Sequence, residues 1–160
     1  MDVYDYAMQM EKDGENLYRE AAGRASHVGI GAIMTMLADA EVAHYDLFKK
    51  MKEQKGGRLP EAGILKDVKN IFVRMKEAGG LQAAGVSEVE LYKKAQDIEK
   101  KSENFYRDSA SKAGEAERES FIQVADEEKK HYFVLEQIID FVSRPQQWLE
   151  NAEWYHLDEY

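Results

Sequence analysis

The chain contains two pairs of closely similar segments, and this internal duplication constrains its fold more than any other feature. Residues 7–22 read AMQMEKDGENLYREAA, and residues 95–110 read AQDIEKKSENFYRDSA. Residues 38–45, ADAEVAHY, recur in the same way as residues 125–132, ADEEKKHY. Such a repeat indicates that one structural unit is built twice. We therefore expect the two halves of the fold to be related by a pseudo-two-fold axis.

Each half of the repeat carries one Glu and one Glu-x-x-His motif. The repeated residues are Glu11, Glu41 and His44 in the first half, and Glu99, Glu128 and His131 in the second. Residues three apart lie on the same face of a helix, so the Glu and His of one motif can point toward the same place. A third motif of this spacing, Glu153 and His156, has no repeated partner, and we expect it to be a surface pair.

Composition narrows the classes of function. A chain of 160 residues is long enough for one domain with a sizeable core, and we treat residues 1–160 as a single domain. The net charge of -9 argues against a nucleic-acid partner. Cysteine is absent, which excludes disulfides, thiolate catalysis and cysteine-bound metal modules, and suits a cytoplasmic protein. The charged N-terminal segment is neither a signal peptide nor a membrane span, so we expect no membrane partner.

Apolar residues recur with the helical period along most of the chain, and the sequence predicts an all-α four-helix bundle. The expected long helices span residues 2–25, 30–54, 88–112 and 115–143. The segment between residues 56 and 87 is rich in glycine and too long for a hairpin turn, so we interpret it as a crossover with a short helix over 65–78. Ser87 and Glu90 have the spacing of a capping box at the start of the third long helix.

The C-terminal segment, about residues 145–160, contains both tryptophans of the chain. It is too aromatic for a disordered tail, and we expect it to dock either on its own bundle or on a neighbouring subunit.

The repeated ligands favour a site for two metal ions. Four carboxylates nearly neutralise two divalent ions, and a set of carboxylates and imidazoles without sulfur suits iron or manganese better than structural zinc. If the four long helices form a bundle, the six side chains can meet in its core. The cofactor that we expect is therefore a pair of iron ions, with manganese or a mixed pair as the alternative.

The order Glu, Glu-x-x-His, Glu, Glu-x-x-His over four helices resembles the ferritin-like di-iron carboxylate class. Within that class the chain resembles rubrerythrin-type proteins that lack a rubredoxin domain, over about residues 2–143. The resemblance implies that Glu11 and Glu99 are terminal ligands and that Glu41 and Glu128 bridge the two ions. It also implies that His44 and His131 are the imidazole ligands. We predict no catalytic residue beyond this metal site.

Further residues are candidates for supporting roles. Glu15 and Glu103 each lie one turn after a predicted ligand and are possible additional ligands, or else exposed carboxylates. Tyr18 and Tyr106 resemble the tyrosines that hydrogen-bond ligand carboxylates in this class, although ordinary core packing explains them equally well. Three acidic residues are candidate partners for the histidine nitrogens that do not bind metal. They are Asp39, Asp126 and Glu127.

Three functions are compatible with the sequence. The resemblance implies a non-haem di-iron oxidoreductase with a role in oxidative stress, which reduces hydrogen peroxide or activates O2. Because the rubredoxin cysteines are missing, it needs an external electron donor such as a rubredoxin-type carrier protein. The alternatives are a ferroxidase that oxidises and handles Fe(II), and a non-enzymatic metal-binding bundle. We expect a homo-oligomer, with a dimer favoured, although the sequence does not determine the number of subunits.

Overall fold

The computed structural model describes residues 2–60, 63–150 and 156–158, and these residues form six α-helices. The helices are α1 (Val3–Arg24), α2 (Val28–Lys52), α3 (Ile64–Ala78), α4 (Val86–Lys112), α5 (Glu115–Ser143) and α6 (Pro145–Glu150). The described residues contain no strand. The all-α prediction is therefore confirmed, and each predicted long helix begins and ends within two residues of an observed one.

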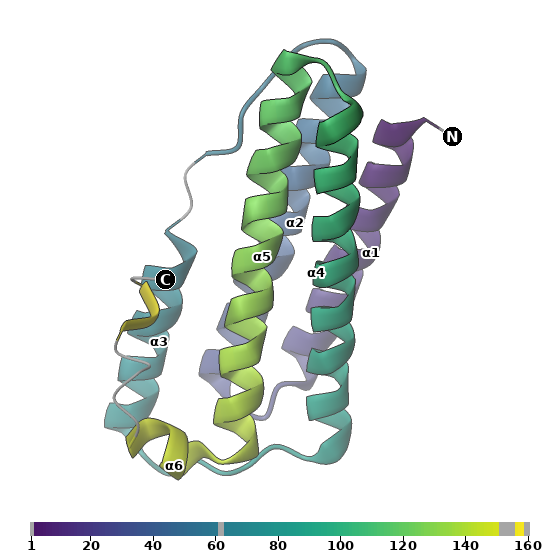
Figure 1. Cartoon of the computed structure of the whole chain (residues 1–160). Coiled ribbons are helices and arrows are strands. Elements are labelled where there is room, and N and C mark those ends of the chain that lie inside the picture. The colour runs from purple at the N-terminus through teal and green to yellow at the C-terminus, as the bar shows by residue number, and fades with distance from the viewer. Residues whose placement is uncertain (1, 61–62, 151–155, 159–160) are drawn as a thin grey trace.

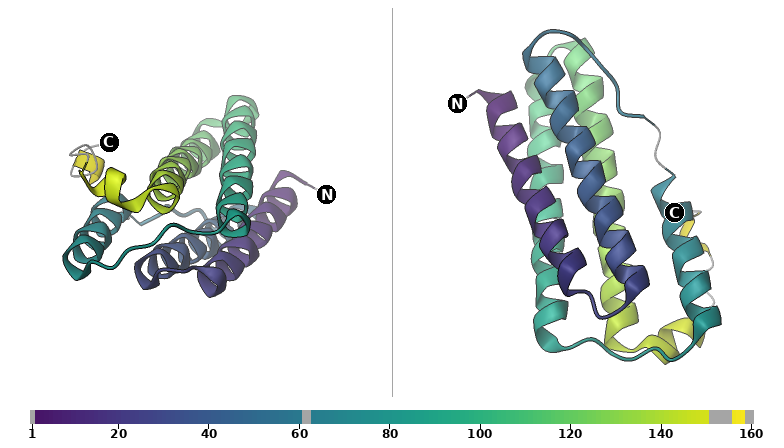
Figure 2. Two further views of the ribbon diagram at one scale, coloured as in Figure 1. Left: turned by 90° about the horizontal axis from the view of Figure 1, so that it is seen from below. Right: turned by 180° about the vertical axis from the view of Figure 1, so that it is seen from behind.

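Four long helices form the bundle, and α3 lies beside it (Figure 1). Helices α1 and α2 form one closely packed pair, and α4 and α5 form the other, as the two views of Figure 2 also show. The chain leaves α2 at one end of the bundle, follows α3 and enters α4 at the opposite end. The segment between the repeated halves is thus a crossover along the bundle, because the second pair must restart at the far end.

The start of α4 differs from the predicted capping box. Gly85 is the N-cap residue and provides no side-chain cap, and the N–H of Val89 donates to its carbonyl oxygen over 3.2 Å. Ser87 therefore lies inside the first turn of the helix, and the prediction that it caps α4 is wrong. The local reason is Glu88, whose carboxylate accepts hydrogen bonds from the Ser26 N–H at 2.7 Å and the Ser26 hydroxyl at 3.0 Å. These bonds hold the first turn of α4 against the turn between α1 and α2.

The described part of the C-terminal segment docks on its own chain. Trp148 on α6 is buried and packs its ring 4.5 Å from that of Phe72 on α3 and 5.5 Å from that of Phe141 on α5. Further along, Leu157 is buried, and Asp158 pairs with Lys69 on α3 at 3.1 Å. Together these contacts fix α3 against α5, because the segment touches both helices.

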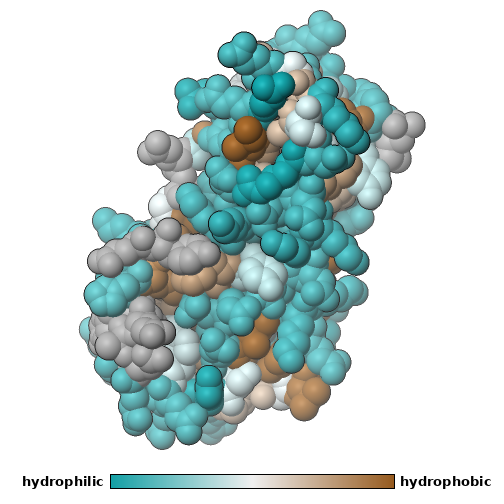
Figure 3. Space-filling view, in the orientation of Figure 1, coloured by the Kyte–Doolittle hydropathy of each residue, from teal (hydrophilic) through white to brown (hydrophobic). Residues whose placement is uncertain are grey.

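The surface agrees with the composition. The face seen in Figure 3 is mostly hydrophilic, with smaller apolar areas separated by polar ones. None of the described helices combines the length and the apolarity needed to cross a membrane.

Candidate metal centre

A layer of polar side chains interrupts the core of the bundle halfway along its length. One apolar cluster contains Leu17 and Leu37 with α3, and the other contains Phe48 and Phe121 near the opposite end. Along every long helix, the predicted ligands lie between residues of the two clusters. All six are nearly inaccessible to solvent, with exposed fractions of 1–3 % for Glu11, Glu41, His44, Glu99, Glu128 and His131.

The structure brings these six residues together in two overlapping groups. Within each group, one ligand atom from every residue lies within 4.8 Å of the others. The first group is Glu11, Glu41, His44 and Glu128, and the second is Glu41, Glu99, Glu128 and His131. Only Glu41 and Glu128 belong to both groups, which is the position that a ligand bridging two ions would occupy.

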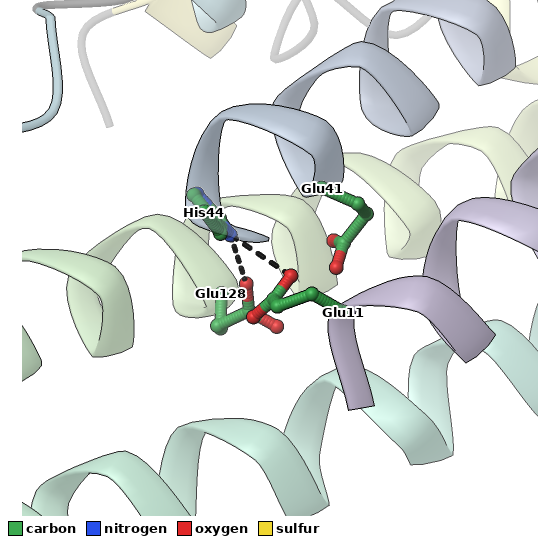
Figure 4. Close-up of side chains that lie close together, drawn as sticks. All are labelled: Glu11, Glu41, His44 and Glu128. Carbon is green, nitrogen blue, oxygen red and sulfur yellow. Dashed lines mark hydrogen bonds and ion pairs between the residues drawn. The ribbon is translucent and has the colours of Figure 1, made fainter. Parts of the chain in front are cut away.

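Figure 4 shows the first group, in which the four side chains point toward one another. Nδ1 of His44 lies 3.3 Å from Oε2 of Glu11 and 2.9 Å from Oε1 of Glu128. In the second group, Nδ1 of His131 lies 3.4 Å from Oε1 of Glu99 and 3.6 Å from Oε1 of Glu41. Each histidine thus touches one carboxylate from its own half and one from the other, and the two groups have the same pattern of contacts.

The two tyrosines of the repeat connect the halves. Tyr106 on α4 donates a hydrogen bond of 2.6 Å to Oε1 of Glu11 on α1. Tyr18 on α1 donates the corresponding hydrogen bond to Oε1 of Glu99 on α4. Both tyrosines are buried. The structure therefore places their hydroxyls on the ligand carboxylates, where they orient one oxygen of each. The other oxygen faces Nδ1 of His44 in Glu11 and has no hydrogen-bond partner among the described residues in Glu99.

Burial and mutual repulsion divide the four carboxyl groups into two kinds. Burial, followed by the charges of neighbouring carboxylates, raises the pKa of Glu41 and Glu128 well above the ordinary value. Burial also acts on Glu99, but the hydrogen bond from Glu128, the charge of His131 and the hydrogen bond from Tyr18 outweigh it and lower the pKa to about 2. The pKa of Glu11 is lowered for the same kind of reason, mainly by the charge of His44 against the effect of burial. Without metal, Glu41 and Glu128 therefore retain their protons to higher pH than ordinary carboxyl groups do.

The arrangement fits a cation better than a closed hydrogen-bond network. Four buried ligand atoms have no hydrogen-bond partner among the described residues, namely Glu41 Oε1, Glu99 Oε2, Glu128 Oε1 and His131 Nδ1. Oε1 of Glu128 is close to His44 but not in hydrogen-bond geometry. Buried polar atoms without partners are costly, and shared binding to a cation would satisfy all of them. The donors are carboxylate and imidazole, which suit iron or manganese.

Glu15 and Glu103 lie outside both groups. Oε2 of Glu15 pairs with Arg19 at 3.1 Å, and Oε1 pairs with Lys12 at the same distance. Oε2 of Glu103 accepts a hydrogen bond of 2.8 Å from Nε of Arg107. In this structure both carboxylates are therefore held by basic side chains on their own helices and belong to neither group of ligand atoms.

The proposed histidine partners occupy different environments. Asp39 and Asp126 are more than half exposed and pair with Arg19 at 2.9 Å and Arg107 at 3.0 Å. The structure therefore contradicts their assignment to the histidine nitrogens. The physical reason is helix phase, because two residues before the ligand Glu correspond to about 200° around the helix. Glu127, by contrast, lines a pocket with both histidines, and its charge helps to raise the pKa of His44.

Two further positions complete the comparison with the sequence. A side chain at Gly14 would bring its Cβ within 2.9 Å of Oε2 of Glu41, so the absence of one gives that carboxylate its space. Sequence reasoning missed this glycine, although it lies within the repeat, where Ser102 is its counterpart. Glu153 lies outside the described residues, so its pairing with His156 stays a prediction.

An all-helical bundle that buries four carboxylates and two imidazoles in one layer is typical of ferritin-like proteins with a metal centre in the bundle core. The chain belongs to the rubrerythrin family, because the family model described as rubrerythrin matches residues 2–139. The predicted family is thereby confirmed, and iron is the metal that this family binds. Comparisons with curated proteins and with solved structures returned no match.

Proposed function

We propose that the protein is a non-haem di-iron oxidoreductase that reduces hydrogen peroxide with electrons from an external donor. The observation that carries this proposal is the sharing of Glu41 and Glu128 between two groups of ligand atoms. Each group would hold one ion with a histidine and a terminal carboxylate. When bound, two ferrous ions would supply the two electrons that convert one hydrogen peroxide and two protons to two waters.

The side chains of this protein have three tasks in such a reaction. Glu11 and Glu99 would bind the metal ions, and the hydroxyls of Tyr106 and Tyr18 fix the orientation of their carboxylates. The two apolar clusters on either side of the centre keep bulk water away from it. Glu41 and Glu128 would have to lose their protons to bind metal, and their raised pKa values would allow their oxygens to take protons again during the reaction.

A pocket of about 450 Å³ supports access for a small oxidant on the histidine side of the centre. It is lined by His44, His131 and Glu127, and by the crossover residues Leu59 and Ile64. The pocket is large enough for hydrogen peroxide or O2. No cysteine occurs in these 160 residues, so they cannot hold cysteine-bound iron themselves, and the proposed electron donor is a separate carrier protein.

The main alternative function is that of a ferroxidase, which oxidises Fe(II) and passes the iron on. Anaerobic protein loaded with two Fe(II) per chain, mixed with either peroxide or O2 in a stopped-flow instrument, separates the two. We expect faster oxidation by peroxide, followed by renewed turnover when a reductant is added. Equal or faster oxidation by O2, with iron then accumulating beyond two per chain, would replace our proposal by the ferroxidase. A metal assay that finds fewer than two ions per chain after loading would contradict both.

A further inference from the structure

A groove reaches the metal centre beside Glu11 and Glu41. It is separate from the pocket lined by His44 and His131, which we call the histidine pocket. It has a volume of about 620 Å³ and runs between α1 and α2, which lie side by side in the right-hand view of Figure 2. Glu11 and Glu41 line it, whereas the histidines and Glu128 do not. The two openings therefore lead to different ligands, the carboxylates on one side and the imidazoles on the other.

The walls of this groove are acidic. Asp5, Glu15 and Asp46 line it together with one basic residue, Lys12. Glu15 pairs with Lys12 and Arg19, and Asp5 pairs with Lys52, which is not among the lining residues. Among the described residues Asp46 forms no ion pair, so its charge is not neutralised by a close partner. A groove whose walls carry a net charge of one sign raises the local concentration of ions of the opposite sign.

The corresponding positions in the second half of the repeat are not acidic to the same degree. Asp5 corresponds to Lys93, Val42 to Lys129 and Asp46 to Phe133. The ligands, their tyrosines and the flanking arginines are duplicated, but the charge of the groove is not. This difference sets the α1–α2 side apart, since the duplication alone would have produced the same charges on both sides.

The inner end of the groove has a carboxylate that is prepared to receive a cation. Glu41 is 3 % exposed, and its Oε1 has no hydrogen-bond partner among the described residues. The missing side chain of Gly14 provides space next to the other oxygen of the same carboxylate. Glu41 is thus buried, incompletely satisfied and next to a local space on the α1 side.

We propose that divalent metal ions reach the centre through the α1–α2 groove, and that Glu11 and Glu41 are the first buried ligands that they meet. This proposal rests on the proposed metal centre but not on the reaction that it performs. The hydrated ion is attracted by Asp5, Asp46 and Glu15 and exchanges its water for carboxylate oxygens of Glu41 and Glu11. The histidine pocket is then left for the small oxidant.

The test is the rate at which metal-free protein binds Co(II), followed by visible absorption in a stopped-flow instrument. Val42→Lys introduces into the groove the residue that occupies the same place in the other half. Val42 lies at the surface, with 36 % of its area exposed, so the substitution is compatible with folding. Ala40→Lys is the matched control, because it adds the same charge to the histidine pocket.

For Val42→Lys we expect association about 3- to 10-fold slower than for the unmodified protein at low salt, with an unchanged final number of ions. The difference should shrink as salt is added, because the effect is electrostatic. Ala40→Lys should bind at close to the unmodified rate, and Asp46→Asn should bind about twofold more slowly.

The outcomes distinguish the route from the centre itself. If Ala40→Lys slows binding as much as Val42→Lys or more, ions do not use the α1–α2 groove and the proposal is overturned, while the metal centre stands. If the unmodified protein binds no Co(II) at all, the metal centre and the route fail together.

Discussion

Tyr106 and Glu11 are 95 residues apart in the sequence, yet the hydroxyl of one donates a hydrogen bond of 2.6 Å to Oε1 of the other. The bond joins α4 to α1 in the buried layer of the bundle. Its counterpart joins Tyr18 to Glu99 in the opposite direction. Each half of the repeat therefore orients a ligand that belongs to the other half.

Replacing this tyrosine should weaken metal binding without unfolding the bundle. In Tyr106→Phe the ring remains packed against Phe48 and Phe121, but the carboxylate of Glu11 loses its orienting donor. We expect metal affinity to fall about 10-fold, measured by competition with a chelator. Tyr92→Phe is the control, because Tyr92 is buried on the same helix near Glu88 and not near a ligand. Equal affinities for the two variants would contradict the role given to Tyr106.

Neutralising a shared ligand should have opposite effects on the metal-free and metal-bound protein. Glu41→Gln keeps the shape of the side chain but removes the cost of retaining, in the folded protein, a proton that the unfolded chain releases at neutral pH. Without metal, the variant should be about 1–3 kcal/mol more stable than the unmodified protein at neutral pH. The stabilisation gained on adding metal should be largely lost, as urea unfolding with and without metal would measure. Glu127→Gln is the control, because it neutralises the residue next to Glu128 on α5. This variant should keep the stabilisation that metal binding provides.

The stability of the metal-free protein should pass through a maximum near pH 4.5. The folded protein retains protons on Glu41 and Glu128 that the unfolded chain releases near the ordinary carboxyl pKa of 4.5, so stability falls as pH rises above that value. The raised pKa of His44 acts in the same direction above 6.5. The pKa of Glu99 is lowered to about 2, so its contribution is lost as pH falls from 4.5 toward 2.

Urea unfolding of the metal-free protein on both sides of pH 4.5 measures this profile. Metal binding competes with the same protons, so the stabilisation by metal should increase with pH, and a pH indicator should detect proton release on binding. A metal-free protein that becomes more stable between pH 4.5 and neutrality would contradict the assignment of the raised pKa values.

Filling the space at Gly14 should separate helix stability from metal affinity. Alanine is favoured over glycine inside a helix by about 1 kcal/mol, so the metal-free variant Gly14→Ala should be as stable as the unmodified protein or more stable. Its Cβ would displace the carboxylate of Glu41, and metal affinity should fall about 10-fold. Ser102→Ala is the control at the equivalent place in the other half. Serine already has a Cβ at this position, so the variant should bind metal nearly normally. A tighter metal complex in Gly14→Ala would show that Glu41 does not need this space.

The elements that the sequence predicts well are those that depend on periodicity and repetition. The helix over 115–143 coincides with α5, and the repeat located the six residues that meet in the buried layer. The capping box at Ser87 failed because Glu88 binds Ser26, a contact between segments 62 residues apart that no local pattern contains.

The environments of other candidate residues could have been predicted more closely from the sequence alone. Lys12, Glu15 and Arg19 have the three- and four-residue spacing of helical ion pairs, which already predicts that Glu15 is engaged at the surface. Helical phase likewise places Asp39 away from the ligand face of α2. The space beside Gly14 could not have been predicted from the sequence, because it depends on how closely α1 and α2 approach each other.

The crossover that contains α3 has a consequence for how the centre assembles. Neither group of ligand atoms is complete within one half of the repeat, because Glu128 joins Glu11, Glu41 and His44, and Glu41 joins the other three. Two separate helix pairs would form such a centre only by meeting in solution, with a yield that falls on dilution. The covalent connection makes that meeting intramolecular, with an effective concentration fixed by the length of the linker. Within one chain, the two halves of the centre therefore stay together however dilute the protein becomes.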